Sequence, residues 1–161
     1  MTRRQFLARL AAVPVASLWP ASGSSPEQAL EDDPIRICEG TGHSTMLTWR
    51  GARLAEGTGY SSVLRLSGGR FRFEGRLWTV RTSGSIATLN EGTGYSAAAT
   101  LRGGRVAEGT GHRALWTIRQ SRDTARICPG TSHSAEWTAR GQPMTDAQTL
   151  ATLVALEAVG A

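Results

Sequence analysis

A glycine-rich motif returns along this chain about every 17 residues, and this repeat constrains the fold more than any other feature. The motif reads Glu-Gly-Thr-Gly and is followed by His or Tyr. A fixed period of this length is typical of one small supersecondary unit that packs against copies of itself. Full copies begin at Glu39, Glu56, Glu91 and Glu108, and degenerate copies begin at Glu74 and Pro129.

Short segments of alternating polarity lie between the copies of the motif. In residues 47–50 (Leu-Thr-Trp-Arg) and 116–119 (Trp-Thr-Ile-Arg), apolar side chains alternate with Thr and Arg. This period of two predicts half-buried strands whose apolar side chains face inward. The strands run into two-residue turns, such as 51–52 (Gly-Ala) and 103–104 (Gly-Gly), where glycine supplies the positive φ that such hairpin turns require. One repeat is therefore predicted to hold a strand, a turn, a shorter return strand and a Gly-rich turn.

Two architectures fit a unit of this kind. We predict an all-β fold in which an antiparallel hairpin meander, built from repeats of about 17 residues, closes into a barrel or folds into a sandwich. The alternative is a β-solenoid, in which equivalent residues stack about 4.8 Å apart and the motif glutamates would form one column of like charge. In a meander the same residues are about 9.6 Å apart, with Arg-bearing strands between them. The smaller repulsion favours the meander.

The repeats span residues 35–143, and the segments on either side of them have other patterns. Residues 144–161 predict one C-terminal helix, because Thr145 can cap its start and one face of the segment is apolar. We expect this helix to close one end of the β structure. Residues 24–34 are rich in Ser, Pro and acidic residues and predict a linker.

Residues 1–23 resemble a twin-arginine export signal. Residues 2–7 (Thr-Arg-Arg-Gln-Phe-Leu) match its Ser/Thr-Arg-Arg-x-Phe-Leu core, although Ala8 replaces the usual lysine. An apolar stretch at 10–19 and then small residues follow, in the order of a secretory signal. The resemblance implies export by the twin-arginine pathway to the periplasm or the extracellular space. The stretch 10–19 is too short to span a bilayer and no other apolar run follows, so we expect no transmembrane span in the mature chain.

The charge of the chain depends on this signal. All 18 basic side chains other than histidine are arginines, and the formal net charge is +5. Loss of Arg3, Arg4 and Arg9 with the signal leaves 15 arginines against 13 acidic residues, or +2. Because this excess is small and no basic tail is present, we expect no specific nucleic acid binding.

Pairs of arginines bracket three of the predicted hairpin tips and are candidate anion-binding residues. Residues on either side of a two-residue turn lie opposite each other, where like charges repel. Two guanidinium groups could instead grip a phosphate, sulfate or carboxylate. The pattern suits binding to an anionic polymer or lipid of the cell envelope, but a merely solvated surface is the simpler interpretation. The pairs are Arg50 and Arg53, Arg102 and Arg105, and Arg119 and Arg122.

The three histidines, His43, His112 and His133, occupy the same position of the repeat. Three imidazoles suit zinc or copper, which gives the alternative of a small periplasmic metal-binding protein or metalloenzyme. Equivalent positions about 9.6 Å apart are too far for shared ligation unless the side chains converge. Tyr60 and Tyr95 fill the same position in other repeats, so an aromatic platform is the simpler interpretation and no cofactor is expected.

The two cysteines, Cys38 and Cys128, also occupy matching positions. In an oxidising compartment such a pair usually forms a disulfide, which we predict here. The bond requires that the two strands meet directly, because a separation of about 9.6 Å exceeds the reach of a disulfide.

The tryptophans on the apolar strand faces have two interpretations. We predict that they pack in the core, and the alternative is a pocket in which they stack on a flat ligand. The residues are Trp49, Trp78, Trp116 and Trp137.

No arrangement of residues that is typical of an enzyme stands out, whether a Ser-His-Asp order, a close carboxylate pair, a phosphate loop or a zinc signature. The sequence therefore predicts an exported, non-enzymatic β-repeat protein with a binding or structural role in the cell envelope. Such a role includes self-assembly.

Overall fold

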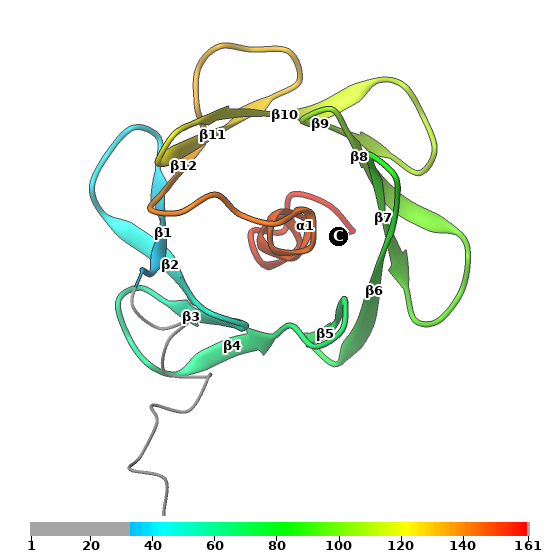
Figure 1. Cartoon of the computed structure of the whole chain (residues 1–161), viewed down its shortest axis with the longest axis horizontal. Coiled ribbons are helices and arrows are strands. Elements are labelled where there is room, and N and C mark those ends of the chain that lie inside the picture. The colour runs from blue at the N-terminus through cyan, green and yellow to red at the C-terminus, as the bar shows by residue number, and fades with distance from the viewer. Residues whose placement is uncertain (1–32, 161) are drawn as a thin grey trace, which may run out of the picture.

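The computed structural model describes residues 33–160, which form one antiparallel sheet wrapped around a single helix (Figure 1). The predicted signal at 1–23 lies outside the described residues, as does most of the predicted linker at 24–34. No helix in the described part of the chain is long and apolar enough to cross a membrane. The strands are β1 (Ile35–Glu39), β2 (Thr45–Arg50), β3 (Arg53–Glu56), β4 (Ser62–Arg65), β5 (Arg70–Phe73), β6 (Arg76–Ser83), β7 (Ile86–Glu91), β8 (Ala97–Arg102), β9 (Arg105–Glu108), β10 (Ala114–Ser121), β11 (Thr124–Pro129) and β12 (Trp137–Arg140), and the helix is α1 (Asp146–Ala155).

The strands follow one another around the sheet as a meander, in the order β4-β3-β2-β1-β12-β11-β10-β9-β8-β7-β6-β5. β1 pairs with β12, so the first and last strands lie side by side. The edge strands β4 and β5 are neighbours in Figure 1. Within residues 33–160 no ladder of hydrogen bonds joins the two strands, and the turn between them holds one isolated bridge, from Ser67 to Arg70. We call this opening the seam. The predicted antiparallel meander is confirmed in the form of a nearly closed barrel, and the solenoid alternative is wrong.

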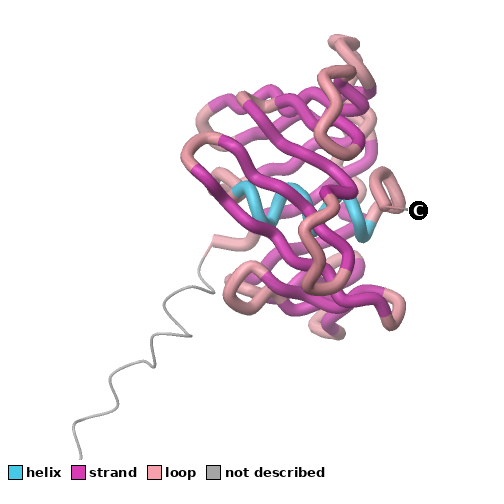
Figure 2. The backbone as a smooth tube through the Cα atoms, turned by 90° about the vertical axis from the view of Figure 1, so that its right-hand side faces the viewer, coloured by secondary structure: helices cyan, strands magenta, loops and turns pink. Residues whose placement is uncertain are grey.

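The helix lies inside the barrel. Figure 1 shows α1 at the centre of the ring of strands, and Figure 2 shows it running through the interior. Leu150, Leu153 and Val154 are buried in the core that it shares with the inner face of the sheet. The expectation that α1 closes one end of the β structure was therefore wrong. A ring of twelve strands encloses a lumen wider than strand side chains alone can fill, and the helix fills it.

The helix is shorter than the predicted 144–161, although it begins as predicted. The Thr145 hydroxyl accepts a hydrogen bond from the Gln148 backbone N–H, and the Gln148 side chain accepts one from the Thr145 N–H. These reciprocal bonds form a capping box. The helix ends at Ala155 because Glu157 takes a left-handed conformation with φ of 54°, which reverses the chain.

The tryptophans belong to the core, as predicted. Trp49 and Trp78 are almost fully buried, while Trp116 and Trp137 are partly buried with ring centroids 4.8 Å apart. The indole N–H of Trp49 donates a hydrogen bond to the Thr152 hydroxyl oxygen at 2.8 Å. This bond joins β2 to α1 across the lumen.

Candidate functional site

Five of the Gly-rich motifs form loops that fold back on the outer face of the sheet, and we call these loops flaps. Figure 1 shows them as five large loops around the ring. A Thr of a nearby strand holds the base of each flap by donating its hydroxyl hydrogen to a glycine carbonyl at 2.5 to 2.6 Å. The flaps are residues 40–44, 57–61, 92–96, 109–113 and 130–136, and the bonds join Thr138 to Gly40, Thr48 to Gly57, Thr79 to Gly92, Thr100 to Gly109 and Thr117 to Gly130.

An Arg two residues beyond the Thr holds the outer end of four of the flaps. The Arg50 guanidinium donates to the carbonyls of Gly59 and Thr58 and lies 4.6 Å from the centre of the Tyr60 ring. Tyr60 is 87% exposed, so the outer face of this Arg–Tyr stack is open to solvent. The repeated Thr-x-Arg of the strands and the repeated Gly-Thr-Gly of the loops are thus the two halves of one contact. Arg81 makes the same contacts and stacks on Tyr95, and Arg119 and Arg140 donate to carbonyls of their own flaps.

Two of the three predicted arginine pairs lie opposite each other at a hairpin tip. Arg50 faces Arg53 in the register of β2 and β3, and Arg102 faces Arg105 in that of β8 and β9. The first pair is not arranged to share an anion, because the Arg50 guanidinium is bound to its flap.

The third predicted pair was wrong. Arg119 lies opposite Arg126, and Ser121 lies opposite Thr124, so Arg122 sits in the turn itself. The pairing of β10 with β11 continues through the two residues that the spacing assigned to the turn, which lengthens this hairpin and separates Arg119 from Arg122.

Arg102 differs from the other flap-side arginines. Within residues 33–160 no hydrogen-bond acceptor or carboxylate contacts its guanidinium, nor that of Arg105. Both side chains line a hollow of about 130 Å³ together with His112, and no acidic residue of the described part of the chain lines it. We call this site the flap hollow. It brings together two predicted anion-binding residues and one of the predicted metal ligands.

A larger hollow of about 510 Å³ lies on the outer face at the seam, and we call it the seam groove. The degenerate motif at Glu74 forms a tight turn instead of a flap, and Val63 of β4 stands where other strands carry the flap-holding Thr. No flap therefore covers this part of the sheet. Arg65, Arg70 and Arg72 line the groove, and again none of the acidic residues that the structure describes does so. Three guanidinium groups around one hollow suit a phosphate, sulfate or carboxylate group.

Our sequence reasoning missed the seam groove. The available signal was the missing Thr-Gly-Tyr after Gly75, since a repeat that lacks its flap leaves its strand uncovered.

The histidines lie on three flaps that follow one another around the barrel, and all three are exposed. His43 is on flap 40–44, and His112 and His133 are on the flaps that precede β10 and β12. Residues 33–160 contain no group of three or more His, Cys, Asp or Glu side chains placed to hold a metal ion. The fold places the three histidines on consecutive flaps, but it does not bring their side chains together at one site.

The predicted disulfide was wrong. Cys38 and Cys128 are buried and free. Strand β12 lies between β1 and β11, so the cysteines are separated by at least two strand spacings, about 9.6 Å, which is beyond disulfide reach. The closure that the bond required does not occur, because β1 meets β12 and not β11.

Comparison with protein-family models, with curated proteins and with solved structures finds no match to this chain.

Proposed function

We propose that this chain is an exported, non-catalytic protein of the cell envelope that binds an anionic polymer on the outer face of its barrel. One observation carries the proposal: among the described residues, two hollows on this face, the flap hollow and the seam groove, are lined by arginines and by no carboxylate. Within residues 33–160, Arg70, Arg72, Arg102 and Arg105 have no acidic partner. Guanidinium groups that are exposed and unpaired are available to an anion at little desolvation cost.

The positions of the two hollows favour a polymer over a small anion. The flap hollow is built on β8 and β9, and the seam groove on β4, β5 and β6. From β5 to β8 is three strand spacings in the sheet, or about 14 Å. A chain that reaches both sites gains from the high effective concentration of its second charged group, whereas a single phosphate gains nothing.

We expect the Arg102→Gln/Arg105→Gln variant to bind a polyuronate such as alginate about tenfold more weakly than the parent, because each exposed charged contact is worth up to about 1 kcal/mol. The Arg70→Gln/Arg72→Gln variant should lose a similar amount, and the quadruple variant should show almost no binding. Binding of the parent should weaken as salt rises, since salt screens exposed charges. Titration calorimetry with long and with short uronate chains measures these effects, and the short chains should bind less tightly.

The matched control is Arg122→Gln/Arg126→Gln, which removes the same charge from exposed positions that line neither hollow. It should bind alginate within about twofold of the parent if position and not net charge matters. If all three double variants lost the same affinity for alginate, net charge alone would explain the effect, and the two hollows would not be the binding site. If the protein bound vesicles of anionic phospholipid but not alginate, the ligand would be a lipid surface and not a polymer.

Export is tested separately. The Arg3→Lys/Arg4→Lys variant should remain in the cytoplasm, because the twin-arginine pathway that residues 2–7 resemble reads the arginine pair. Fractionation followed by immunoblotting locates the protein. Delivery that is unchanged in a strain without the twin-arginine translocase would exclude this route.

A further inference from the structure

Three of the core tryptophans differ in the hydrogen bonding of their indole N–H groups. The indole N–H of Trp49 donates to the Thr152 hydroxyl, and that of Trp116 donates to the Ala158 carbonyl at 3.1 Å. The indole nitrogen of Trp78 is buried and has no hydrogen-bond partner among the described residues. Trp78 is only 2% exposed, so bulk water does not supply the missing acceptor. A buried donor of this kind is costly unless something accepts its hydrogen.

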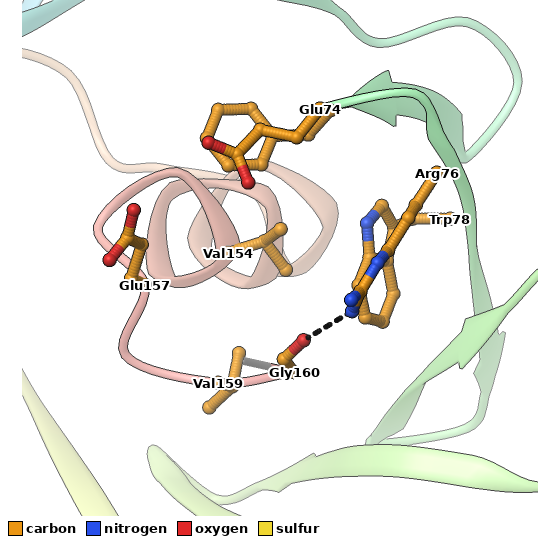
Figure 3. Close-up of a pocket in the computed structure, with 8 residues that line it drawn as sticks. Glu74, Arg76, Trp78, Val154, Glu157, Val159 and Gly160 are labelled. Carbon is orange, nitrogen blue, oxygen red and sulfur yellow. Dashed lines mark hydrogen bonds between the residues drawn. The ribbon is translucent and has the colours of Figure 1, made fainter.

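Trp78 lines a cavity of about 230 Å³ between the barrel wall and the C-terminal end of α1. Figure 3 shows its indole ring on one side of the cavity and Val154 of the helix on the other. Phe73 adds a second aromatic wall. A cavity of this volume is smaller than a typical drug-sized site, so its occupant would be a small molecule with a flat or apolar face.

Two carboxylates, Glu74 and Glu157, stand at this cavity (Figure 3). Neither is paired with a cation within residues 33–160. Arg76 also lines the cavity, but its guanidinium already donates to the Gly160 carbonyl at 3.3 Å and lies 3.9 Å from the Glu91 carboxylate. The cavity therefore combines an unmatched negative charge with a buried hydrogen-bond donor.

The same two glutamates have an unusual backbone. Among the described residues they alone combine a side chain with a positive φ, 48° for Glu74 and 54° for Glu157. Such conformations favour glycine and persist where the surrounding structure requires them. Both chain reversals direct an acidic residue to the same cavity.

We propose that this cavity binds a small primary amine that also carries a hydroxyl group, of the size of an amino sugar. The ammonium group pairs with Glu74 and Glu157, and a hydroxyl oxygen accepts the hydrogen of the Trp78 indole. The ring of the ligand packs against Phe73, which is only partly buried. The site is separate from the proposed polymer-binding face, because Trp78 points into the barrel while Leu77, its neighbour on β6, lines the seam groove outside.

The test uses the full chain with ¹⁵N-labelled tryptophan and compares four ligands by NMR. Glucosamine has both groups, glucose lacks the amine, N-acetylglucosamine carries it as a neutral amide, and cyclohexylamine lacks the hydroxyls. We expect glucosamine to shift the Trp78 indole N–H resonance in a saturable way and to leave those of Trp49 and Trp116 in place. The other three ligands should bind at least tenfold more weakly.

Substitutions separate the two contacts. Glu74→Gln/Glu157→Gln should weaken glucosamine binding about tenfold or more, because both charges that face the ammonium group are lost. Its control, Glu56→Gln/Glu108→Gln, removes the same charge from exposed positions outside the cavity and should bind like the parent. Trp78→Phe keeps an aromatic wall but removes the donor, and it identifies the Trp78 resonance.

Two results would overturn the proposal. One is a Trp78 resonance that no ligand moves at saturating concentration, which would leave a buried water as the partner of the indole. The other is equal binding of glucosamine and glucose, which would show that the carboxylates take no part. Neither result bears on the alginate experiment, whose variants all lie on the outer face.

Discussion

The Leu153→Ala variant should unfold with a free energy about 3 kcal/mol below that of the parent, because a buried Leu that is truncated to Ala loses both its transfer free energy and its packing. Leu153 is completely buried in the core that α1 shares with the sheet. Single domains have a total stability of about 5 to 15 kcal/mol, so this one truncation removes a large share. Urea unfolding followed by tryptophan fluorescence measures the loss.

Leu156→Ala is the matched control for this experiment. Leu156 is only partly buried where the helix ends, so the same chemical change should cost clearly less. If Leu153→Ala unfolded at the same urea concentration as the parent, the helix would not occupy the lumen. In that case α1 would be an accessory to a barrel that fills its own interior.

We also expect a large effect from the triple variant Thr48→Val/Thr100→Val/Thr138→Val, which should lower the free energy of unfolding by about 3 to 6 kcal/mol. Each substitution keeps the shape of a buried side chain but leaves one glycine carbonyl without its donor, which costs about 1 to 2 kcal/mol. The three hydrogen bonds join different strands to different flaps, so the losses should add.

Hydrogen exchange locates this loss. The Gly57 and Gly109 N–H groups donate to strand carbonyls at the bases of their flaps and should exchange faster in the triple variant. Thr88→Val is the control, because the Thr88 hydroxyl donates at 3.3 Å to the Arg81 carbonyl within a strand pair and holds no flap. A triple variant as stable as Thr88→Val would mean that the repeated Thr-to-Gly bonds do not hold the flaps.

The site was predictable only where geometry is local. The facing of Arg102 and Arg105 followed from the sequence, since a two-residue turn sets the register of the residues beside it. The same spacing gave a wrong prediction for Arg119 and Arg122. The four residues 119–122 do not show whether the pairing of β10 with β11 stops at Arg119 or continues beyond it. The seam groove depends on a loop that is absent. The arginines around it come from β4 and β5, which follow each other in the chain, and only the fold decides that these two strands stay unpaired.

The sequence by itself determined the elements of this protein. Alternating residues such as 47–50 predict strands because side chains point to opposite faces with a strict period of two, and Thr145 predicts the start of the helix because capping involves only its own first turn. The tertiary structure alone decided that β1 pairs with β12, that α1 fills the lumen and that the flaps fold onto the outer face. The first two depend on contacts between parts of the chain that lie far apart in the sequence, and four of the flaps depend on a contact between a strand and a loop 9 to 13 residues away. Because the repeats share one motif, no single copy specifies which other copy it will meet.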